Sequence, residues 1–206
     1  MALKTFVKIG GITNLSDARY CSGMYVNLLG FSVEQGSEKY VSPAQFSEIT
    51  GWLSGLEYVG EFENASADEA METLKNYPAI SCGEHQNLDI LIGLKNSALS
   101  LIYKADLEEV RDLEYQVGTT LSEAGIILHL TSNQELLTAK DLEVINLLSE
   151  RCEIILGAGL SSENILDLLS EHTLKGIALT GGTEIKPGLK YFDELADILE
   201  KLEIEE

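Results

Sequence analysis

The sequence predicts an α/β fold in which eight parallel strands close into a (β/α)8 TIM barrel, a single domain over residues 1–206. Short runs rich in β-branched residues and leucine alternate with longer amphipathic stretches along the whole chain. This alternation indicates a parallel sheet with helical crossovers. The length agrees as well, because such barrels begin at about 200 residues.

Eight apolar runs are the strand candidates, and each is short enough to cross a sheet once. In chain order they are residues 5–9, 26–31, 57–62, 78–82, 98–103, 125–130, 152–156 and 175–179.

Capping residues mark several helix starts between these runs. Asn14 or Ser16 caps the first helix, and Ser42 followed by Pro43 opens the second. The SADE of residues 66–69 has the spacing of a capping box. The last helix carries apolar residues at the i, i+3, i+4 and i+7 positions, namely Leu195, Ile198, Leu199 and Leu202.

Two architectures satisfy this order of elements: an open doubly wound sheet and a closed barrel. The strand count favours the barrel. A dinucleotide-binding open sheet has Gly-x-Gly-x-x-Gly after its first strand, and the GGIT of residues 10–13 is too short and wrongly spaced. In a barrel, the C-terminal ends of the strands and the loops after them form the functional face. Gly10 lies on that face.

Composition argues against several classes of partner and indicates a cellular location. The net charge of −20 would repel a nucleic acid backbone. No apolar run approaches the roughly 20 residues of a membrane helix, and no signal peptide is read, so we expect no membrane partner and a cytoplasmic location. The three widely spaced cysteines suit reduced thiols. No metal ligand set or cofactor motif stands out.

Glycine-rich turns follow the seventh and eighth predicted strands. Residues 157–165 read GAGLSSENI, with SSEN opening a helix, and residues 180–189 read TGGTEIKPGL. Glycines let a backbone approach a ligand closely, and a following helix start directs N–H groups at it. This is the place where barrels often bind phosphate. The predicted phosphate-binding residues are Gly157, Ala158, Gly159, Gly181, Gly182 and Thr183.

Several stretches together resemble the phosphoribosylanthranilate isomerase family of tryptophan biosynthesis. KIGGITNLSDA at 8–18 resembles a family segment that usually reads KICGITN, and SEKYVSP at 37–43 resembles its Ser-x-Arg-Tyr-Val-Ser-Pro loop. GLSSENI at 159–165 resembles Gly-Gly-Leu-x-Pro-Glu-Asn-Val. LTGGTEIKPGLKYFDEL at 179–195 resembles Val-Ser-Ser-Gly-Val-Glu-x-x-Pro-Gly-x-Lys-Asp. Residues 65 to 125 resemble the family only loosely.

The resemblance implies an Amadori rearrangement, in which a ribose ring opens and an aminoaldose becomes an aminoketose. An acid protonates the ring oxygen, and a base removes a proton from the neighbouring carbon. The family's base is the cysteine of KICGIT, and Gly10 stands in its place. The family's acid is an aspartate ending the sixth strand, where this chain has His129. The arginine that faces anthranilate becomes Lys39, and a family aspartate in the strand-eight segment becomes Ala178.

Other side chains are candidates for a displaced catalytic group. Lys8 points the same way as Gly10 along the strand, either as a base or as an interior lysine paired with a carboxylate such as Glu61. Cys82, at the end of the predicted fourth strand, is either a relocated thiol or a core residue. Lys104, which resembles a family lysine in position, either neutralises an anionic ligand or forms a Schiff base.

Together these observations predict a barrel that binds a phosphorylated small molecule and lacks efficient isomerase activity, because its base and acid positions hold Gly10 and His129. The alternative is an active phosphoribosylanthranilate isomerase, or a related sugar-phosphate isomerase, with displaced catalytic groups. A third interpretation is an interaction protein with no ligand. The resemblance leaves a monomer and a homodimer equally open.

Overall fold

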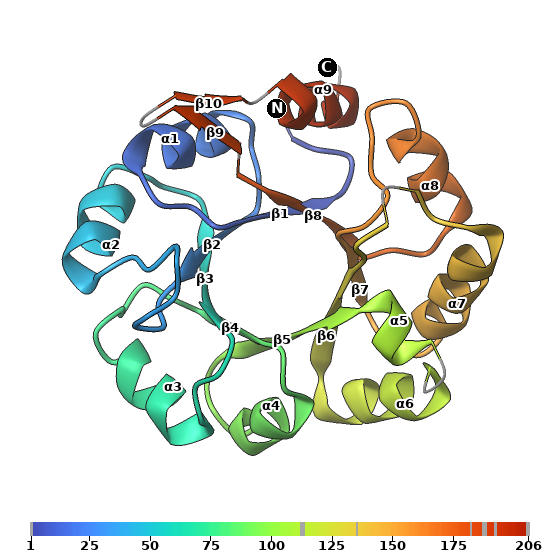
Figure 1. Cartoon of the computed structure of the whole chain (residues 1–206), viewed down its shortest axis with the longest axis horizontal. Helices are drawn as coiled ribbons and strands as arrows, with labels where there is room; N and C mark the ends of the chain where they lie inside the picture. Colours follow the sequence, from blue (N-terminus) through green and yellow to red (C-terminus); the bar gives the residue numbers. More distant parts are fainter. Residues whose placement is uncertain are drawn as a thin grey trace.

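The structure, a computed structural model, describes residues 2–111, 114–134, 136–181, 183–186, 189–191 and 193–204. Eight parallel strands pair in sequence order and close into a barrel with helices around it (Figure 1). The barrel closes where β8 pairs with β1, with Gly10 opposite Thr180. The predicted fold class is confirmed. The barrel strands are β1 (Phe6–Gly10), β2 (Leu28–Ser32), β3 (Glu57–Phe62), β4 (Cys82–His85), β5 (Ser100–Asp106), β6 (Ile126–Thr131), β7 (Ile154–Leu156) and β8 (Gly176–Thr180).

The helices form the outer layer, and two of them connect β5 to β6. Within the described ranges, no helix is long and apolar enough to cross a membrane. The helices are α1 (Leu15–Gly23), α2 (Pro43–Thr50), α3 (Ala67–Leu74), α4 (Leu88–Leu94), α5 (Leu107–Val110), α6 (Glu114–Ala124), α7 (Ala139–Ser149), α8 (Ile165–Glu171) and α9 (Asp193–Leu202).

Side-chain caps fix several of these helix starts. Asn14, rather than Ser16, caps α1 by accepting a hydrogen bond from the Asp17 N–H. Ser42 and Ser66 each begin a capping box, as their spacing predicts. Thr138 begins a capping box for α7. Helix α7 therefore begins at Ala139, several residues after β6 ends at Thr131.

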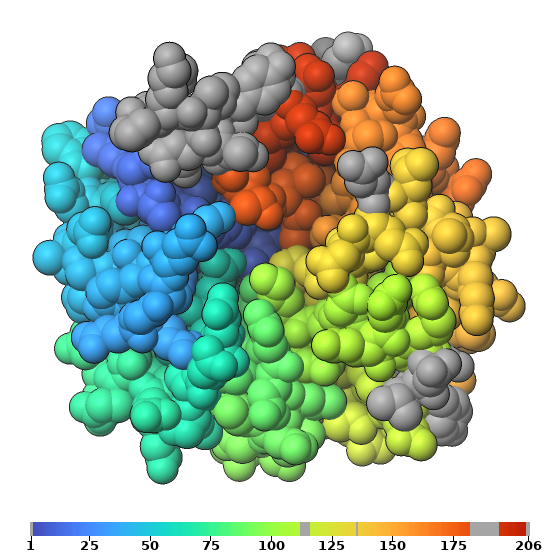
Figure 2. All heavy atoms as spheres, viewed as in Figure 1, coloured from blue at the N-terminus to red at the C-terminus, as the bar shows by residue number. Residues whose placement is uncertain are grey.

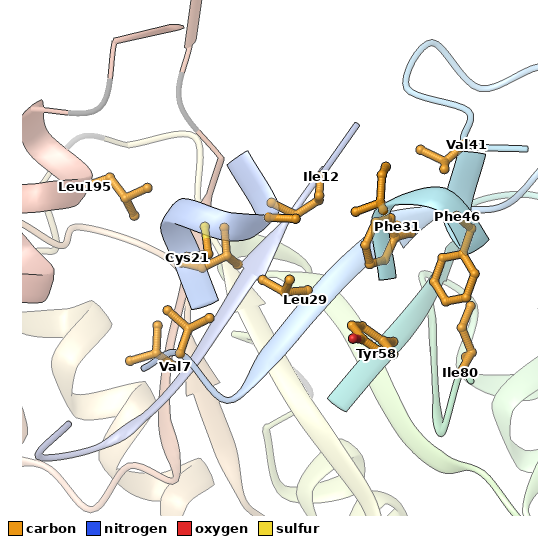
Figure 3. Close-up of a cluster of buried hydrophobic side chains, with 14 of the residues drawn as sticks. Val7, Ile12, Cys21, Leu29, Phe31, Val41, Phe46, Tyr58, Ile80 and Leu195 are labelled. Atoms are coloured by element: carbon orange, nitrogen blue, oxygen red, sulfur yellow. The ribbon is translucent and has the colours of Figure 1, made fainter. Parts of the chain in front are cut away.

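The main core lies between the strands and the surrounding helices. The outward side chains of β1 and β2, including Val7, Leu29 and Phe31, pack against Cys21 of α1 and Phe46 of α2 (Figure 3). The rings of Phe31 and Phe46 meet edge to face with centroids 5.0 Å apart. This contact sets α2 against the barrel and anchors the start of the chain that leads from β2 to α2.

The inside of the barrel is divided into an apolar layer and a polar layer. The lower layer is an apolar cluster that includes Leu28, Val59, Cys82 and Ile102. Inward positions recur every second residue along a strand, so the next inward position lies one layer closer to the C-terminal mouth. Those positions form the polar layer, which consists of Lys8, Glu61, Glu84, Lys104 and His129.

The fourth strand is displaced along the chain from its prediction. The sequence suggested residues 78–82, but β4 begins at Cys82 and ends at His85. Ile80 instead packs into the outer core from a loop. The polar residues that follow belong to the strand because Glu84 bonds to Lys8 inside the barrel, and His85 Nε2 bonds to the Ala65 carbonyl 2.8 Å away.

The segment after β8 also differs from the prediction. A turn leading directly to a helix was expected, but an antiparallel pair comes first, formed by β9 (Thr183–Lys186) and β10 (Leu189–Tyr191). Only then does α9 begin. This hairpin lies over the rim near α1 in Figure 1.

Candidate functional site

A cavity of about 310 Å³ opens at the C-terminal mouth of the barrel, with the polar layer as its floor. Gly10, Lys39 and Gly157 contribute to its walls. Figure 2 shows the molecule hollowed near the middle, between segments coloured blue, green and orange. The structure therefore brings the predicted acid position, base position and Lys104 to one site.

A continuous chain of charged contacts crosses the cavity floor. Lys8 Nζ lies 2.7 Å from Glu61 Oε1 and 3.1 Å from Glu84 Oε2. Glu84 Oε2 lies 2.9 Å from His129 Nδ1. The pairing of Lys8 with Glu61 was one of the two sequence interpretations, and the structure supports it. Lys8, Glu84 and His129 are all buried.

Mutual charge compensation decides the ionisation of Lys8 and Glu84. Burial alone lowers the pKa of Lys8, but the Glu61 and Glu84 carboxylates outweigh burial and raise that pKa above its ordinary value. Burial alone raises the pKa of Glu84, but Lys8 and His129 outweigh it and hold that pKa well below the usual range. Both side chains are therefore charged at neutral pH.

The Glu61 carboxylate occupies the space beside two glycines. A β-carbon placed on Gly10 lies 2.8 Å from Glu61 Oε1, and one placed on Gly30 lies 2.7 Å from Glu61 Cδ. Non-bonded heavy atoms almost never lie within 3.0 Å of a β-carbon, so the carboxylate fits here because both positions lack side chains. The Gly11 N–H also donates to Glu61 Oε2 at 3.2 Å. With its side chain 20% exposed, Glu61 remains accessible from the cavity.

His129 presents one ring nitrogen to its partner and the other to the cavity. Because an ionised carboxylate only accepts hydrogen bonds, Nδ1 carries a proton and donates a hydrogen bond to Glu84. Nε2 faces Gly157, where a β-carbon would lie 2.8 Å from it. Within the described ranges, Nε2 makes no hydrogen bond. The glycine at 157 thus leaves this nitrogen open to a ligand.

Lys39 lies at the rim, between the central cavity and a second one. Its Nζ is 3.2 Å from the place of a β-carbon on Gly11, so the ammonium lies directly over that glycine. The second cavity has a volume of about 1060 Å³, and Lys39 and Gly157 line both. Lys39 is exposed and available to a ligand that spans them.

The second cavity gathers four of the six predicted phosphate-binding residues. Its walls include Gly157, Ala158, Gly159 and Gly181. Gly182 lies outside the described residues. Only the backbone of Thr183 is described, and it begins strand β9.

Hydrogen bonding divides these four residues into two kinds. The Gly157 N–H donates to the Leu130 carbonyl at 2.8 Å, and the Gly181 N–H donates to the Gly10 carbonyl at 3.0 Å. Those two N–H groups are already satisfied by the barrel. Among the described residues, the N–H groups of Ala158 and Gly159 donate to no partner. Those two are the donors that this loop offers to a ligand.

The loop after β7 has a locally fixed shape. Asn164 Nδ2 donates to the Gly159 carbonyl at 2.8 Å, and Asn164 Oδ1 accepts from the Ser161 N–H at 2.9 Å. Gly159 has a φ of +62°, a left-handed conformation that favours glycine. Leu137 packs against the same glycine, with its Cγ 2.7 Å from the place of a β-carbon. Helix α8 follows only at Ile165, after an intervening turn.

Cys82 lies away from this site, in agreement with the second of its two sequence interpretations, a core residue. It begins β4 instead of ending it, so it lies in the apolar layer below the cavity floor. Its Sγ contacts Glu57 Oε2 at 3.9 Å, at the opposite end of β3 from Glu61. Burial raises the pKa of the Cys82 thiol. The displacement of the fourth strand is the reason for the misplacement.

Known proteins with similar sequences align with almost the whole chain. No family model matches the chain. N-(5′-phosphoribosyl)anthranilate isomerase of Maridesulfovibrio salexigens is 26% identical over 200 residues, covering 94% of this chain and 96% of that protein. The enzyme of the same name from Gloeothece citriformis is 28% identical over 211 residues, covering 95% and 93%. The chain is thus similar to N-(5′-phosphoribosyl)anthranilate isomerases over nearly its whole length.

Solved structures of phosphoribosylanthranilate isomerases share the barrel. The enzyme from Thermotoga maritima superposes with a TM-score of 0.78 at 20% identity, covering 96% of this chain and 98% of that chain. A phosphoribosylanthranilate isomerase in complex with reduced 1-(o-carboxyphenylamino)-1-deoxyribulose 5-phosphate gives a TM-score of 0.76 at 21% identity, with the same coverage.

Two residues at the mouth of the barrel were not predicted as site residues from the sequence. Glu61 was considered only as a partner of Lys8, and Glu84 was given no role of its own. The available signal was a glutamate at an inward position of an otherwise apolar strand, YVGEF at 58–62. A charged residue there requires a partner inside the barrel.

Proposed function

We propose that this chain binds a phosphorylated small molecule at the mouth of the barrel and does not catalyse the Amadori rearrangement with the efficiency usual for its family. The observation that carries the proposal is at Gly10. The position where the resemblance places a catalytic thiol has no side chain, and an ion pair between Glu61 and Lys8 fills the space beside it.

Binding is supported by the groups around the second cavity. The N–H groups of Ala158 and Gly159 are suited to a phosphate, because each has a hydrogen bond to donate. A family structure contains a ribulose 5-phosphate derivative, and we extend the phosphate end of that ligand to this chain.

Two arguments support weak isomerase activity: the rate lost when a general acid or base is missing, and the residues at the rim of the cavity. Loss of one general acid or base typically lowers a rate by about 10² to 10⁴. Lys39 stands where the family has an arginine that faces anthranilate, and a lysine does not provide the planar fork that grips a carboxylate twice. Glu38 and Glu63 line the same cavity and repel an anionic aromatic head group.

Two measurements on the purified protein test the proposal. Turnover of phosphoribosylanthranilate is followed by the loss of its anthranilate fluorescence at high protein concentration. We expect no turnover above buffer. Thermal unfolding is then compared with ribose 5-phosphate and with ribose. We expect the phosphorylated sugar alone to raise the melting temperature, and turnover at family rates or no shift with ribose 5-phosphate would contradict the proposal.

The second candidate is an isomerase with displaced groups, and the geometry of His129 favours it. Its Nε2 opens to the cavity while Glu84 holds its Nδ1, which is the arrangement of a carboxylate-oriented general acid. Lys104 lies beside His129 on the neighbouring strand. Turnover of phosphoribosylanthranilate that His129→Ala or Lys104→Ala abolishes, with the fold intact, would support this candidate over the first.

A further inference from the structure

The polar layer contains more proton-transfer chemistry than a binding site needs. Glu61 is a carboxylate that is accessible from the cavity, and His129 presents an open ring nitrogen to the same cavity. Lys8 and Glu84 lie between them and keep both in place through contacts of 2.7, 3.1 and 2.9 Å. A potential base and a potential acid therefore stand on one floor, separated by a fixed pair of charges.

We propose that Glu61 is a general base of this site, and that with His129 it transfers a proton between C1 and C2 of a phosphorylated aldose. The inference rests on the proposed binding of a phosphorylated ligand and adds a reaction to it. Its central observation is spatial. The carboxylate lies at the place from which a side chain on Gly10 would act, so it faces the same part of the ligand.

Three features suit Glu61 to this role. Gly10 and Gly30 leave its carboxylate uncovered on the side of the strands, since a β-carbon at either would overlap it. Lys8 and the Gly11 N–H both donate to it, so its orientation is fixed before a ligand arrives. Its side chain is 20% exposed and lines the cavity, where it can reach a carbon acid next to a carbonyl group of a bound ligand.

The reaction balances without an added oxidant or reductant. Glu61 takes the proton from C2 of the open-chain aldose, and the electron pair of that C–H bond forms the C1=C2 double bond. The C1 carbonyl oxygen takes a proton from Nε2 of His129 in its imidazolium form, which gives an enediol and leaves a neutral ring whose remaining proton is on Nδ1, bonded to Glu84. Glu61 then returns its proton to C1, the C2 hydroxyl proton passes to His129, and a C2 ketone forms. Aldose has become ketose.

The rim of the cavity explains why an aldose fits better than the family substrate. Glu38 and Glu63 line this cavity together with Lys39, and Glu61 lies on its floor. These three carboxylates disfavour an anionic aromatic acid on C1, whereas hydroxyl groups of a sugar can donate hydrogen bonds to them. The phosphate end remains at the loop after β7.

The test uses ribose 5-phosphate labelled with deuterium at C2. Wild-type protein is expected to release the label to water and form ribulose 5-phosphate, faster than it turns over phosphoribosylanthranilate. Glu61→Ala is expected to lower this rate by about 10² to 10⁴ while ribose 5-phosphate still raises the melting temperature. Added formate, which fits the space left by the carboxylate, is expected to restore part of the rate in a concentration-dependent manner.

Glu57→Gln, prepared in the same way, is the matched control, because it removes a carboxylate from the other end of the same strand. It should keep the wild-type rate. If Glu61→Ala loses its fold, Glu61→Gln keeps the shape of the side chain and decides the matter. Equal rates for Glu61→Gln and wild type would overturn the assignment of the base.

The two proposals fail in distinguishable ways. A melting shift with ribose 5-phosphate but no release of label would overturn the role of Glu61 and leave ligand binding intact. Absence of both would overturn binding and the base together. Release of label that is lost in Glu61→Ala and recovered with formate would establish Glu61 as the base, because a purely structural role does not respond to a small carboxylate.

Discussion

Glu61 Oε1 lies 2.8 Å from the place that a β-carbon on Gly10 would take. The two residues belong to different strands, β3 and β1, with β2 between them. They are neighbours because Gly30 on β2 also has no side chain. The carboxylate reaches across the intervening strand and meets Lys8 on the far side. Gly10, Gly30 and Glu61 are thus parts of one packing arrangement.

The first prediction concerns Gly10→Ala and Gly30→Ala. An alanine in a strand normally gains about 0.5 to 1 kcal/mol over glycine, but crowding of the Glu61 carboxylate should make both substitutions destabilising by about 1 to 3 kcal/mol. Gly30→Ala should cost more, since its β-carbon also lies 3.1 Å from the backbone of Gly10. Urea unfolding measures both free energies.

The same two substitutions in a Glu61→Ala background provide the control. With the carboxylate removed, Gly10→Ala should become neutral or stabilising, whereas Gly30→Ala keeps part of its cost. Equal costs in the two backgrounds would show that Glu61 does not occupy this space.

The second prediction concerns Glu84→Gln. Removing one partner from a buried charge network leaves the others uncompensated, which typically costs about 3 to 5 kcal/mol. Lys8 loses one of its two carboxylates and His129 loses its oriented partner. Glu72→Gln removes an exposed partner of Lys75 and should cost less than about 1 kcal/mol. Similar costs for the two variants in urea unfolding would argue against the buried network.

The third prediction concerns the dependence of stability on pH. The pKa of Glu84 is lowered in the folded chain, whereas an unfolded glutamate binds its proton near about pH 4.3. The unfolded state therefore binds more protons below that pH, and the contribution of Glu84 is lost as the pH falls. The raised pKa of Lys8 gives a contribution that is complete below about pH 10.4 and is lost as the pH rises further.

Unfolding in urea from pH 3 to 7 tests the acid side. Wild-type stability should fall below about pH 5, and Glu84→Gln should show a shallower fall. A slope that is unchanged in the variant would assign the acid sensitivity to other carboxylates.

The fourth prediction separates backbone strain from crowding at Gly159. Gly159 and Gly125 have nearly the same φ, +62° and +65°, but only Gly159 has Leu137 against it. Gly125→Ala should cost about 1 to 2 kcal/mol for the left-handed conformation alone. Gly159→Ala should cost about 1 to 3 kcal/mol more. Adding Leu137→Ala to Gly159→Ala should remove this additional destabilisation. Thermal unfolding of the three variants measures it, and an additional cost that persists without Leu137 would show that crowding by Leu137 is not its cause.

The fifth prediction concerns Lys39, which lines both cavities. Lys39→Ala should weaken the binding of ribose 5-phosphate by roughly tenfold to a hundredfold, because a charged hydrogen bond contributes about 1.5 to 3 kcal/mol. Lys75→Ala removes a lysine that pairs with Glu72 on α3 and should leave affinity unchanged. Calorimetric titration at two salt concentrations gives the affinities. Equal weakening by both variants would show that the loss of affinity comes from the change in net charge and not from a contact made by Lys39.

Much of the fold could be predicted because its signals are local. The alternation of short apolar runs with amphipathic stretches reports the order of strands and helices, and the caps at Asn14, Ser42 and Ser66 are each set within four residues of sequence. The fourth strand was misplaced because apolar content favoured PAISC. The true strand, CGEH, is polar because its partners lie on distant strands.

The site was predictable only where one position could be examined alone. The absence of a base side chain at Gly10 is visible in one letter, and so is the histidine at 129. The role of Glu61 depends on the pairing of β1, β2 and β3, which brings Glu61 beside Gly10 and Gly30 from more than 30 residues away. Likewise, the division of the loop N–H groups into satisfied and free ones depends on which carbonyl groups face them.

The packing of Glu61 against two glycines makes the order of mutational steps important. Starting from this chain, a cysteine at position 10 would crowd the Glu61 carboxylate, so a thiol fits there more easily once residue 61 is smaller. In the opposite direction, a glutamate at 61 fits in this position only when positions 10 and 30 both lack side chains. The effect of a substitution at any one of these three positions therefore depends on which residues stand at the other two.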